Sequence, residues 1–140
     1  MTSARPLIHA LGAAVILAGL AASGPAAAHH SFAMFDFGKT VTLKGEVKEF
    51  QWTNPHVILW VVGSRGAGLA AEEWTVELTS PGNLTRMGWT KRSLNPGDKL
   101  EVDFYPLRDG KRGGGFSRAT LANGVVLTAN QRDLDRQGAQ

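Results

Sequence analysis

Cysteine is absent from this sequence of 140 residues. A chain without cysteine forms no disulfide, and it offers no thiolate as a nucleophile or as a metal ligand. A strong charge imbalance is also absent, because 15 Lys and Arg residues oppose 12 Asp and Glu residues and only the stretch 108–118 is locally basic. Nucleic-acid binding normally requires clustered basic side chains that displace counterions. We therefore predict that nucleic acid is not a partner.

The N-terminal region lacks acidic residues, since none precedes Asp36. One basic side chain, Arg5, is followed by an apolar run over 7–20 and then by small residues that end at Ala28. Charged, apolar and small-residue segments in this order are typical of a signal peptide, and Ala26-Ala27-Ala28 offers a cleavage site. We predict that residues 1–28 are a cleavable signal peptide and that the mature protein is periplasmic or secreted.

The apolar run over 7–20 is shorter than the roughly 20 residues that a membrane-spanning helix needs. We therefore predict no stable membrane span after processing, and a retained membrane anchor is the alternative. A lipoprotein anchor is excluded because no cysteine lies beside the cleavage site.

Alternating apolar and polar residues dominate the mature sequence, with turn residues between the runs. The first run alternates through Val47 and then shifts phase before Phe50, which predicts a bulge or a sharp bend close to Gly45. Residues 109–115 are rich in glycine and are expected to form a flexible loop. The expected strands are 41–52, 57–62, 73–78, 99–104, 116–121 and 125–128, and the last two flank a hairpin turn at Asn123-Gly124.

One segment has helix signals. Ser80 can cap a helix, Pro81 suits its first turn, and Gly88 suits its end. This order of elements predicts an all-β fold, a small five-stranded OB-like barrel with one short helix between strands three and four. An antiparallel β-sandwich is the alternative. The predicted mature chain consists of an N-terminal segment with a histidine pair (29–38), the barrel domain (39–129) and a polar tail (130–140).

Several spaced motifs resemble those of a family of small secreted bacterial proteins known only as a domain of unknown function. The motifs are His29-His30-Ser31-Phe32, Trp52-Thr53-Asn54-Pro55-His56, Glu77-Leu78-x-Ser80-Pro81, Gly88-Trp89-Thr90 and Ser93-Leu94-x-Pro96-Gly97-Asp98. The stretches Gly45-Glu46-Val47 and Asn54-Pro55-His56 are also similar to periplasmic bacterial OB-fold proteins, which supports the barrel. Neither resemblance implies an activity.

The histidine pair is the sharpest candidate site. Cleavage after Ala28 would give His29 a free α-amino group beside its own imidazole. The amine and Nδ1 can chelate one Cu(II) ion, and His30 or His56 could supply a third nitrogen. If cleavage falls one residue earlier, His30 stands third in the chain and binds copper through backbone nitrogens instead. The alternative is a solvated chain end that binds no metal.

The residues after this pair are apolar. Met34 is either a soft ligand for Cu(I) or a packing residue beside Phe32, Phe35 and Phe37. We expect this segment to dock onto the barrel and to hold the histidines in place.

Trp52, Asn54 and Trp89 form a candidate ligand surface, with one of the two tryptophans expected to be exposed at a loop. His56 follows Asn54 in a turn, and the alternative interpretation is that it has only a structural role there. Glu77 is predicted to point outward on a solvated strand face without a basic catalytic partner.

Three functions follow from these observations. The first is an exported, non-catalytic periplasmic binding module that contacts an envelope protein or a small ligand. The second is a copper-binding or copper-delivery protein that uses His29 with His30 or His56. The third is a copper-dependent oxidase at the same site, although no residue pattern indicates an enzyme.

Overall fold

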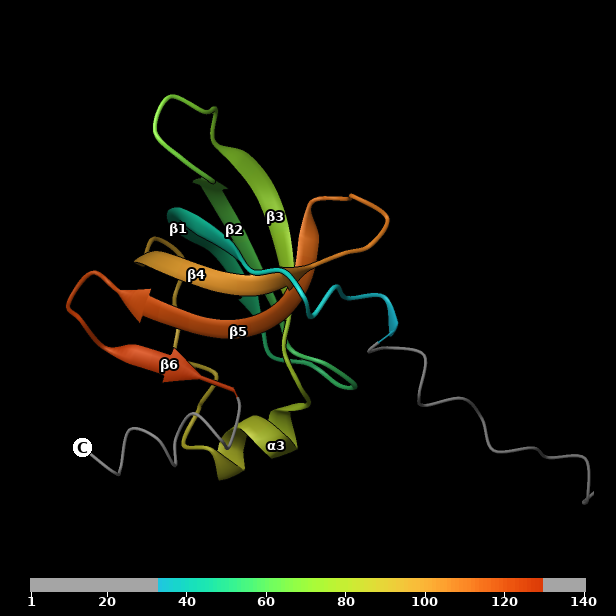
Figure 1. Ribbon diagram of the computed structural model, residues 1–140. Helices are drawn as coiled ribbons and strands as arrows, with labels where there is room; N and C mark the ends of the chain where they lie inside the picture. The colour runs from blue at the N-terminus through green and yellow to red at the C-terminus, as the bar shows by residue number, and fades with distance from the viewer. Residues whose placement is uncertain (1–32, 130–140) are drawn as a thin grey trace, which may run out of the picture. The chain divides into compact units, whose positions relative to one another are not determined.

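The computed structural model describes residues 33–129, which contain six strands and a short helix (Figure 1). None of the helices in this described range is long and apolar enough to cross a membrane. In chain order the elements are β1 (Val41–Gln51), β2 (Ile58–Ser64), β3 (Glu72–Glu77), α3 (Pro81–Arg86), β4 (Lys99–Pro106), β5 (Gly113–Leu121) and β6 (Val126–Thr128).

Five of the strands form a closed barrel. Antiparallel pairing gives the order β3-β2-β1-β4-β5-β6, and a parallel pairing of β3 with β5 joins the two ends of the first five strands. Among the strands of residues 33–129, β6 pairs with β5 alone and lies outside the barrel. The predicted OB-like barrel, with its helix between the third and fourth strands, is therefore confirmed. The alternative sandwich is wrong, because the β3–β5 pairing closes a single sheet.

Barrel closure depends on three consecutive glycines. Gly113, Gly114 and Gly115 pair with the last three residues of β3 and are buried. A Cβ on Gly113 would lie 2.8 Å from the Thr75 carbonyl oxygen. The expectation of a flexible loop is wrong for these residues, because their lack of side chains lets β5 pass between β3 and β4 at close range.

Strand β1 bends where the sequence predicts it. Its pairing with β2 changes register between Val47 and Glu49, which confirms the bulge. Nearby, Gly45 faces Gly63 across the two strands, and a Cβ on Gly45 would lie 2.3 Å from the Val62 carbonyl oxygen. The bend thus brings two backbones closer than any side chain at Gly45 would allow.

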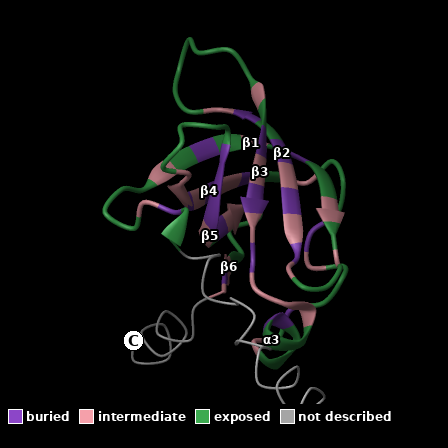
Figure 2. Cartoon of the chain, turned by 90° about the vertical axis from the view of Figure 1, so that its right-hand side faces the viewer, coloured by how far each residue is buried: buried purple, intermediate pink, exposed green. Residues whose placement is uncertain are grey.

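The core fills the barrel and is extended by α3 (Figure 2). Ser80 caps α3, because its Oγ accepts a hydrogen bond of 3.3 Å from Asn83 N, and Gly88 follows the helix with a φ of +84°. Both helix signals are confirmed, and the helix turns Leu84 into the core. The fully buried side chains include Leu43, Val47, Leu59, Val61, Val76, Leu84, Leu94, Val102 and Phe104.

Candidate functional site

His56 lies in the connection between β1 and β2, after the cis peptide bond that joins Asn54 to Pro55. Its Nδ1 is 2.5 Å from Oε1 of Glu77, the last residue of β3. The two side chains are partly exposed, at 37% for His56 and 25% for Glu77. The contact forms because β2 and β3 pair so that Glu77 lies opposite Ile58, two residues after His56.

This contact limits where the imidazole can carry a proton. An ionised carboxylate only accepts hydrogen bonds, so a hydrogen bond across the 2.5 Å contact requires a proton on Nδ1 of His56. In the neutral imidazole the lone pair is then on Nε2. Metal-binding histidines in proteins commonly have this arrangement, in which a carboxylate orients the ring and leaves the other nitrogen for the ion.

The segment just before β1 packs close to this pair. Phe35 is buried, forms a bridge with Leu107, and contacts the outer face of Gly115, since a Cβ there would lie 3.0 Å from Phe35 Cδ2. Gly115 is the parallel partner of Glu77. The expected docking of the apolar segment is therefore observed for residues 34–37, and it occurs beside Glu77.

Backbone hydrogen bonds hold this segment at both ends of Phe35. Asp36 N donates to the Pro106 carbonyl at 2.8 Å, and Arg108 N donates to the Met34 carbonyl at 2.9 Å. Phe37 remains exposed but its ring contacts Tyr105, with ring centroids 4.9 Å apart and ring planes tilted by 57°. Met34 is also exposed, at 45%.

The three residues of the predicted ligand surface differ in how far they are exposed. Trp89 is only 3% exposed, and its Nε1 donates a 2.7 Å hydrogen bond to the Thr128 carbonyl. Trp89 is thus a core residue, and its buried ring is unavailable for stacking on a ligand. Trp52 is half-buried against Phe50, whereas Asn54 is exposed. The helix and the following loop place the Trp89 side chain in the core. The sequence around Gly88 does not indicate this orientation.

His29 and His30 lie outside the described residues. Within 33–129, the structure brings together no group of three or more His, Asp and Glu side chains that could hold a metal ion. It does bring His56 to Glu77, a residue that the sequence had suggested to be solvated. The alternation of β3 gives the outward direction of Glu77, but only the pairing of β2 with β3 shows that His56 lies beside it.

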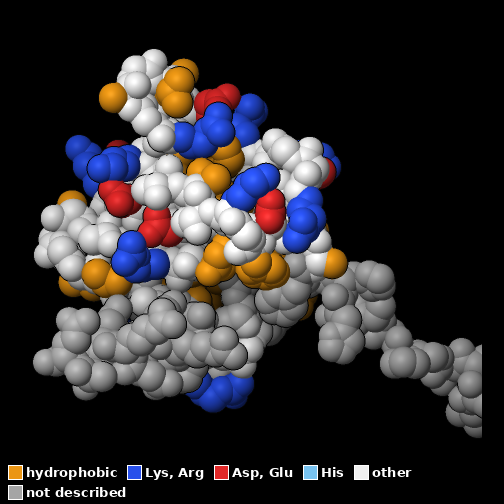
Figure 3. Space-filling model, in the orientation of Figure 1, with side chains coloured by type: hydrophobic (Ala, Val, Ile, Leu, Met, Phe, Trp, Pro, Cys, Tyr) orange, Lys and Arg blue, Asp and Glu red, His pale blue; other side chains and the backbone are white. Residues whose placement is uncertain are grey.

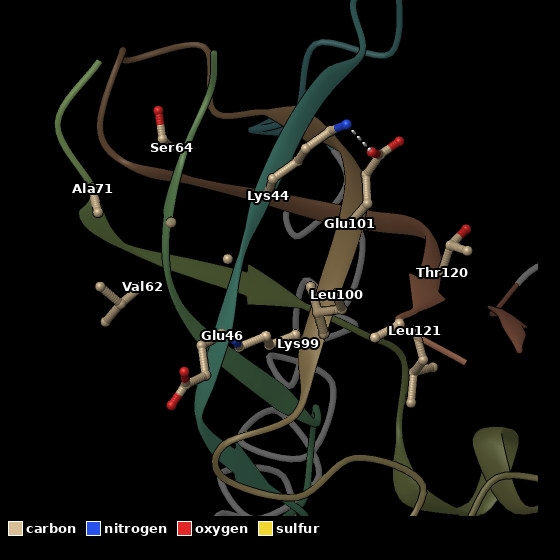
Figure 4. Close-up of a pocket in the computed structure, with 13 residues that line it drawn as sticks. Lys44, Glu46, Val62, Ser64, Ala71, Lys99, Leu100, Glu101, Thr120 and Leu121 are labelled. Carbon is tan, nitrogen blue, oxygen red and sulfur yellow. Dashed lines mark ion pairs between the residues drawn. The ribbon is translucent and has the colours of Figure 1, made fainter. Parts of the chain in front are cut away.

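A second feature is an open groove across four strands (Figure 4). A row of paired residues, Gly63, Gly45, Leu100 and Leu121, crosses it from β2 to β5. The groove has a volume of about 640 Å³, and Gly45 and Gly63 leave part of this space open because they have no side chains. Its lining is mostly apolar. A volume of this size is within the range of small-molecule sites.

Charged side chains surround the groove in pairs of opposite sign. Lys44 Nζ lies 2.9 Å from Glu101 Oε2 on one rim, and this hydrogen bond raises the pKa of Lys44 above its usual value. Lys99 and Glu46 line another part of the rim. The groove therefore has no strong net charge of either sign.

Opposite charges are also mixed over the rest of the surface. On the face that Figure 3 shows, Lys and Arg side chains lie among Asp and Glu side chains. Arg118 and Arg112, from the segment that is locally basic in sequence, form ion pairs with Asp103 at 2.8 Å and with Glu72 at 3.1 Å. The local excess of basic residues thus does not give an unpaired cationic stripe within residues 33–129.

These features define a small five-stranded barrel with one outer strand, an open apolar groove and a carboxylate–histidine pair. A family model described as a family of unknown function (DUF6152) matches residues 17–120, so the chain belongs to this family. The predicted resemblance to a family of unknown function is confirmed. No curated protein and no solved structure matches the chain.

Proposed function

We propose that this protein is an exported, non-catalytic binding module that acts in the periplasm or outside the cell. The single observation that supports binding is the groove across β2, β1, β4 and β5. Export is supported by the order of charged, apolar and small residues before His29. Mass spectrometry of the exported protein should find His29 as its first residue, and an intact Met1 would contradict export.

The lining of the groove indicates the kind of ligand. Its apolar floor favours a small, largely apolar molecule, and its paired charges favour one without a strong net charge. The Ser64 hydroxyl at the margin has one proton, and two carbonyl oxygens within reach already compete for it, Gly66 O at 2.7 Å and Leu69 O at 3.0 Å. The groove is therefore suited to burying apolar surface, and we assign it to binding without a reaction step.

A neutral fluorescent probe, N-phenyl-1-naphthylamine, tests this proposal. Saturable binding at one probe per chain is expected, with fluorescence rising as the probe leaves water. Ala71→Trp should abolish binding, because Ala71 is exposed on the groove lining and a large side chain there fills the groove. Ala67→Trp is the matched control, since Ala67 is exposed but does not line the groove.

Two results would contradict groove binding. One is an absence of saturable probe binding to the folded protein. The other is equal probe affinity of the Ala71→Trp and Ala67→Trp variants, which would place the probe elsewhere on the surface.

Copper binding or copper delivery is the second candidate function. The observation that favours it is the 2.5 Å contact between His56 Nδ1 and Glu77 Oε1, because a carboxylate on Nδ1 leaves Nε2 for a metal ion. A copper-dependent oxidase at the same site is the third candidate. It requires that ascorbate-driven oxygen consumption by the copper-loaded protein exceeds that of free Cu(II).

A further inference from the structure

The connection between β2 and β3 extends away from the rest of the barrel (Figure 1), and a second, smaller pocket lies between it and the two strands that it joins. The pocket has a volume of about 220 Å³. Its lining consists of Gly63, Arg65, Leu69, Ala70, Glu72 and Trp74.

A glycine leaves this pocket open. Gly63 pairs with Glu72, so both residues face the same side of the sheet, and Trp74 faces that side too because it lies two residues further along β3. Trp74 is only 6% exposed and contacts Phe104, so it is a core residue that also forms a wall of the pocket. Because Gly63 has no side chain, the space beside Glu72 is not filled.

Arg65 brings a positive charge to the pocket. Its guanidinium carbon lies 5.3 Å from the centroid of the Trp74 ring, in a cation–π contact. This contact orders the guanidinium but supplies no oxygen acceptor for its N–H groups. Among residues 33–129, no carboxylate lies within ion-pair distance of Arg65. Arg65 can therefore offer its planar set of donors to a negatively charged ligand.

The one carboxylate in the lining already has a partner. Glu72 Oε1 lies 3.1 Å from Nη1 of Arg112, which is in the loop before β5. Two cations and one carboxylate therefore leave one net positive charge here. Trp74 also has a donor without an acceptor, because its Nε1 is buried and has no hydrogen-bond partner within the described chain. The unpartnered polar side chains of the lining are thus donors, which favours an anionic ligand.

Ser64 organises the apolar side of the pocket. Its Oγ accepts a hydrogen bond of 3.2 Å from Gly66 N and lies 3.0 Å from the Leu69 carbonyl oxygen. Leu69 N in turn donates to the Gly66 carbonyl at 3.3 Å. These contacts close the connection into a compact turn and position Leu69, which lines the pocket beside Ala70. A wall that is ordered before binding reduces the entropy that binding has to remove.

We infer that this pocket binds a small monocarboxylate with an apolar body. The carboxylate accepts from the Arg65 guanidinium, and the apolar body lies against Leu69 and Ala70. The volume is below the roughly 300–1,000 Å³ of drug-sized sites, which limits the body to a single ring or a short chain. Gly63 lines both the pocket and the groove, but the inference does not depend on the function proposed for the groove.

Titration of the purified protein with benzoate tests the pocket. Saturable changes in the NMR signals of the Arg65 guanidinium and the Trp74 indole are expected, at one benzoate per chain. Benzamide has the same shape without the charge. It should bind roughly 10-fold more weakly, because hydrogen bonds between charged groups are stronger than neutral ones.

Substitution of Arg65 tests its role directly. Arg65→Ala should weaken benzoate binding by roughly 10-fold or more, through the loss of hydrogen bonds between charged groups. Arg65→Lys keeps the charge but not the planar fork, and it should retain part of the affinity. Circular dichroism melting curves establish that each variant is folded.

Arg92→Ala is the matched control. Like Arg65, Arg92 is exposed and forms no ion pair within residues 33–129, but it does not line the pocket. The net charge of the protein falls equally in both variants, so benzoate affinity should be unchanged in Arg92→Ala.

Glu72→Gln tests the charge of the pocket. Loss of the carboxylate leaves Arg65 and Arg112 without a neighbouring negative charge. Benzoate should then bind roughly 2–5-fold more tightly at low salt, and the gain should shrink at high salt. An unchanged or lower affinity of Glu72→Gln would contradict an anion site.

Four results would overturn the pocket as a carboxylate site. They are an absence of saturable benzoate binding, equal affinities for benzoate and benzamide, equal losses in Arg65→Ala and Arg92→Ala, and displacement of N-phenyl-1-naphthylamine by benzoate. The last result would place both probes in the groove. Naphthylamine binding that is unaffected by benzoate is expected, so a failure of the pocket and a failure of the groove can be told apart.

Discussion

Gly114 packs directly under the backbone of Tyr105, so that a Cβ on Gly114 would lie 2.2 Å from the Tyr105 carbonyl oxygen. The same Cβ would lie 2.5 Å from Phe104 Cδ2, in a ring that is fully buried. Strand β5 passes between β3 and β4 at this point, so neither neighbour can move aside without opening the barrel.

Gly114→Ala should therefore destabilise the protein strongly. Overpacking of a buried site typically costs about 1–3 kcal/mol, and we expect the upper end of this range because one clash is with backbone. Chemical denaturation followed by circular dichroism measures the change in the free energy of unfolding.

Gly82→Ala is the control for this substitution. Gly82 is in α3, has a helical φ and has no atom within 4 Å of its added Cβ. Alanine should stabilise this position by roughly 0.5–1 kcal/mol. Similar destabilisation by Gly114→Ala and Gly82→Ala would argue against a steric role for Gly114.

Trp89→Phe should test the inward packing of this tryptophan. The change removes the 2.7 Å hydrogen bond to the Thr128 carbonyl and part of a ring that contacts Phe50 and Phe116. A loss of about 1–3 kcal/mol is expected, since a buried acceptor loses its donor. Trp52→Phe should change stability by less than about 1 kcal/mol, because the residue is half-buried and the new ring keeps its contact with Phe50. The unfolding free energies of both variants, measured side by side, give the comparison.

Asp36 should make the docked segment sensitive to acid. The hydrogen bond from Lys39, together with the Gly38 N–H and the Arg108 guanidinium, holds the pKa of Asp36 below its usual value of 3.8. A carboxyl whose pKa is lower in the folded state stabilises the fold above pH 3.8 and loses this effect as the pH falls through the folded value. Hydrogen exchange at the Asp36 amide should accelerate over this interval, and NMR titration should give the carboxyl pKa directly.

Asp36→Asn provides the comparison, because it removes the titrating group. Its exchange rate should already be raised at neutral pH and should change less on acidification. High salt should reduce the difference between the two proteins, since Lys39 is exposed and Arg108 is largely so. A directly measured pKa at or above 3.8 would contradict the proposed ion pairs.

Much of the fold follows from local patterns. The alternation of β1 and its phase shift indicate both the strand and its bulge, because side-chain direction has a period of two residues. Ser80, Pro81 and Gly88 define the ends of α3 through preferences that act within one turn. Such features depend on neighbours in sequence and can be predicted from it.

The sites depend on contacts between distant segments. The three glycines at the start of β5 are typical of a loop in the sequence. Residues without side chains are needed there because β3 and β4 both approach the β5 backbone closely. Likewise, the partnership of His56 with Glu77 depends on the register of β2 and β3.

The sequence by itself thus determined the strands, the bulge, the helix ends and the five-stranded barrel. Only the tertiary structure decided that Trp89 is buried, that an apolar groove crosses four strands, and that Phe35 lies beside Glu77. The physical reason is that side-chain alternation specifies which face a residue occupies, whereas its neighbours on that face depend on which strands pair and in which register.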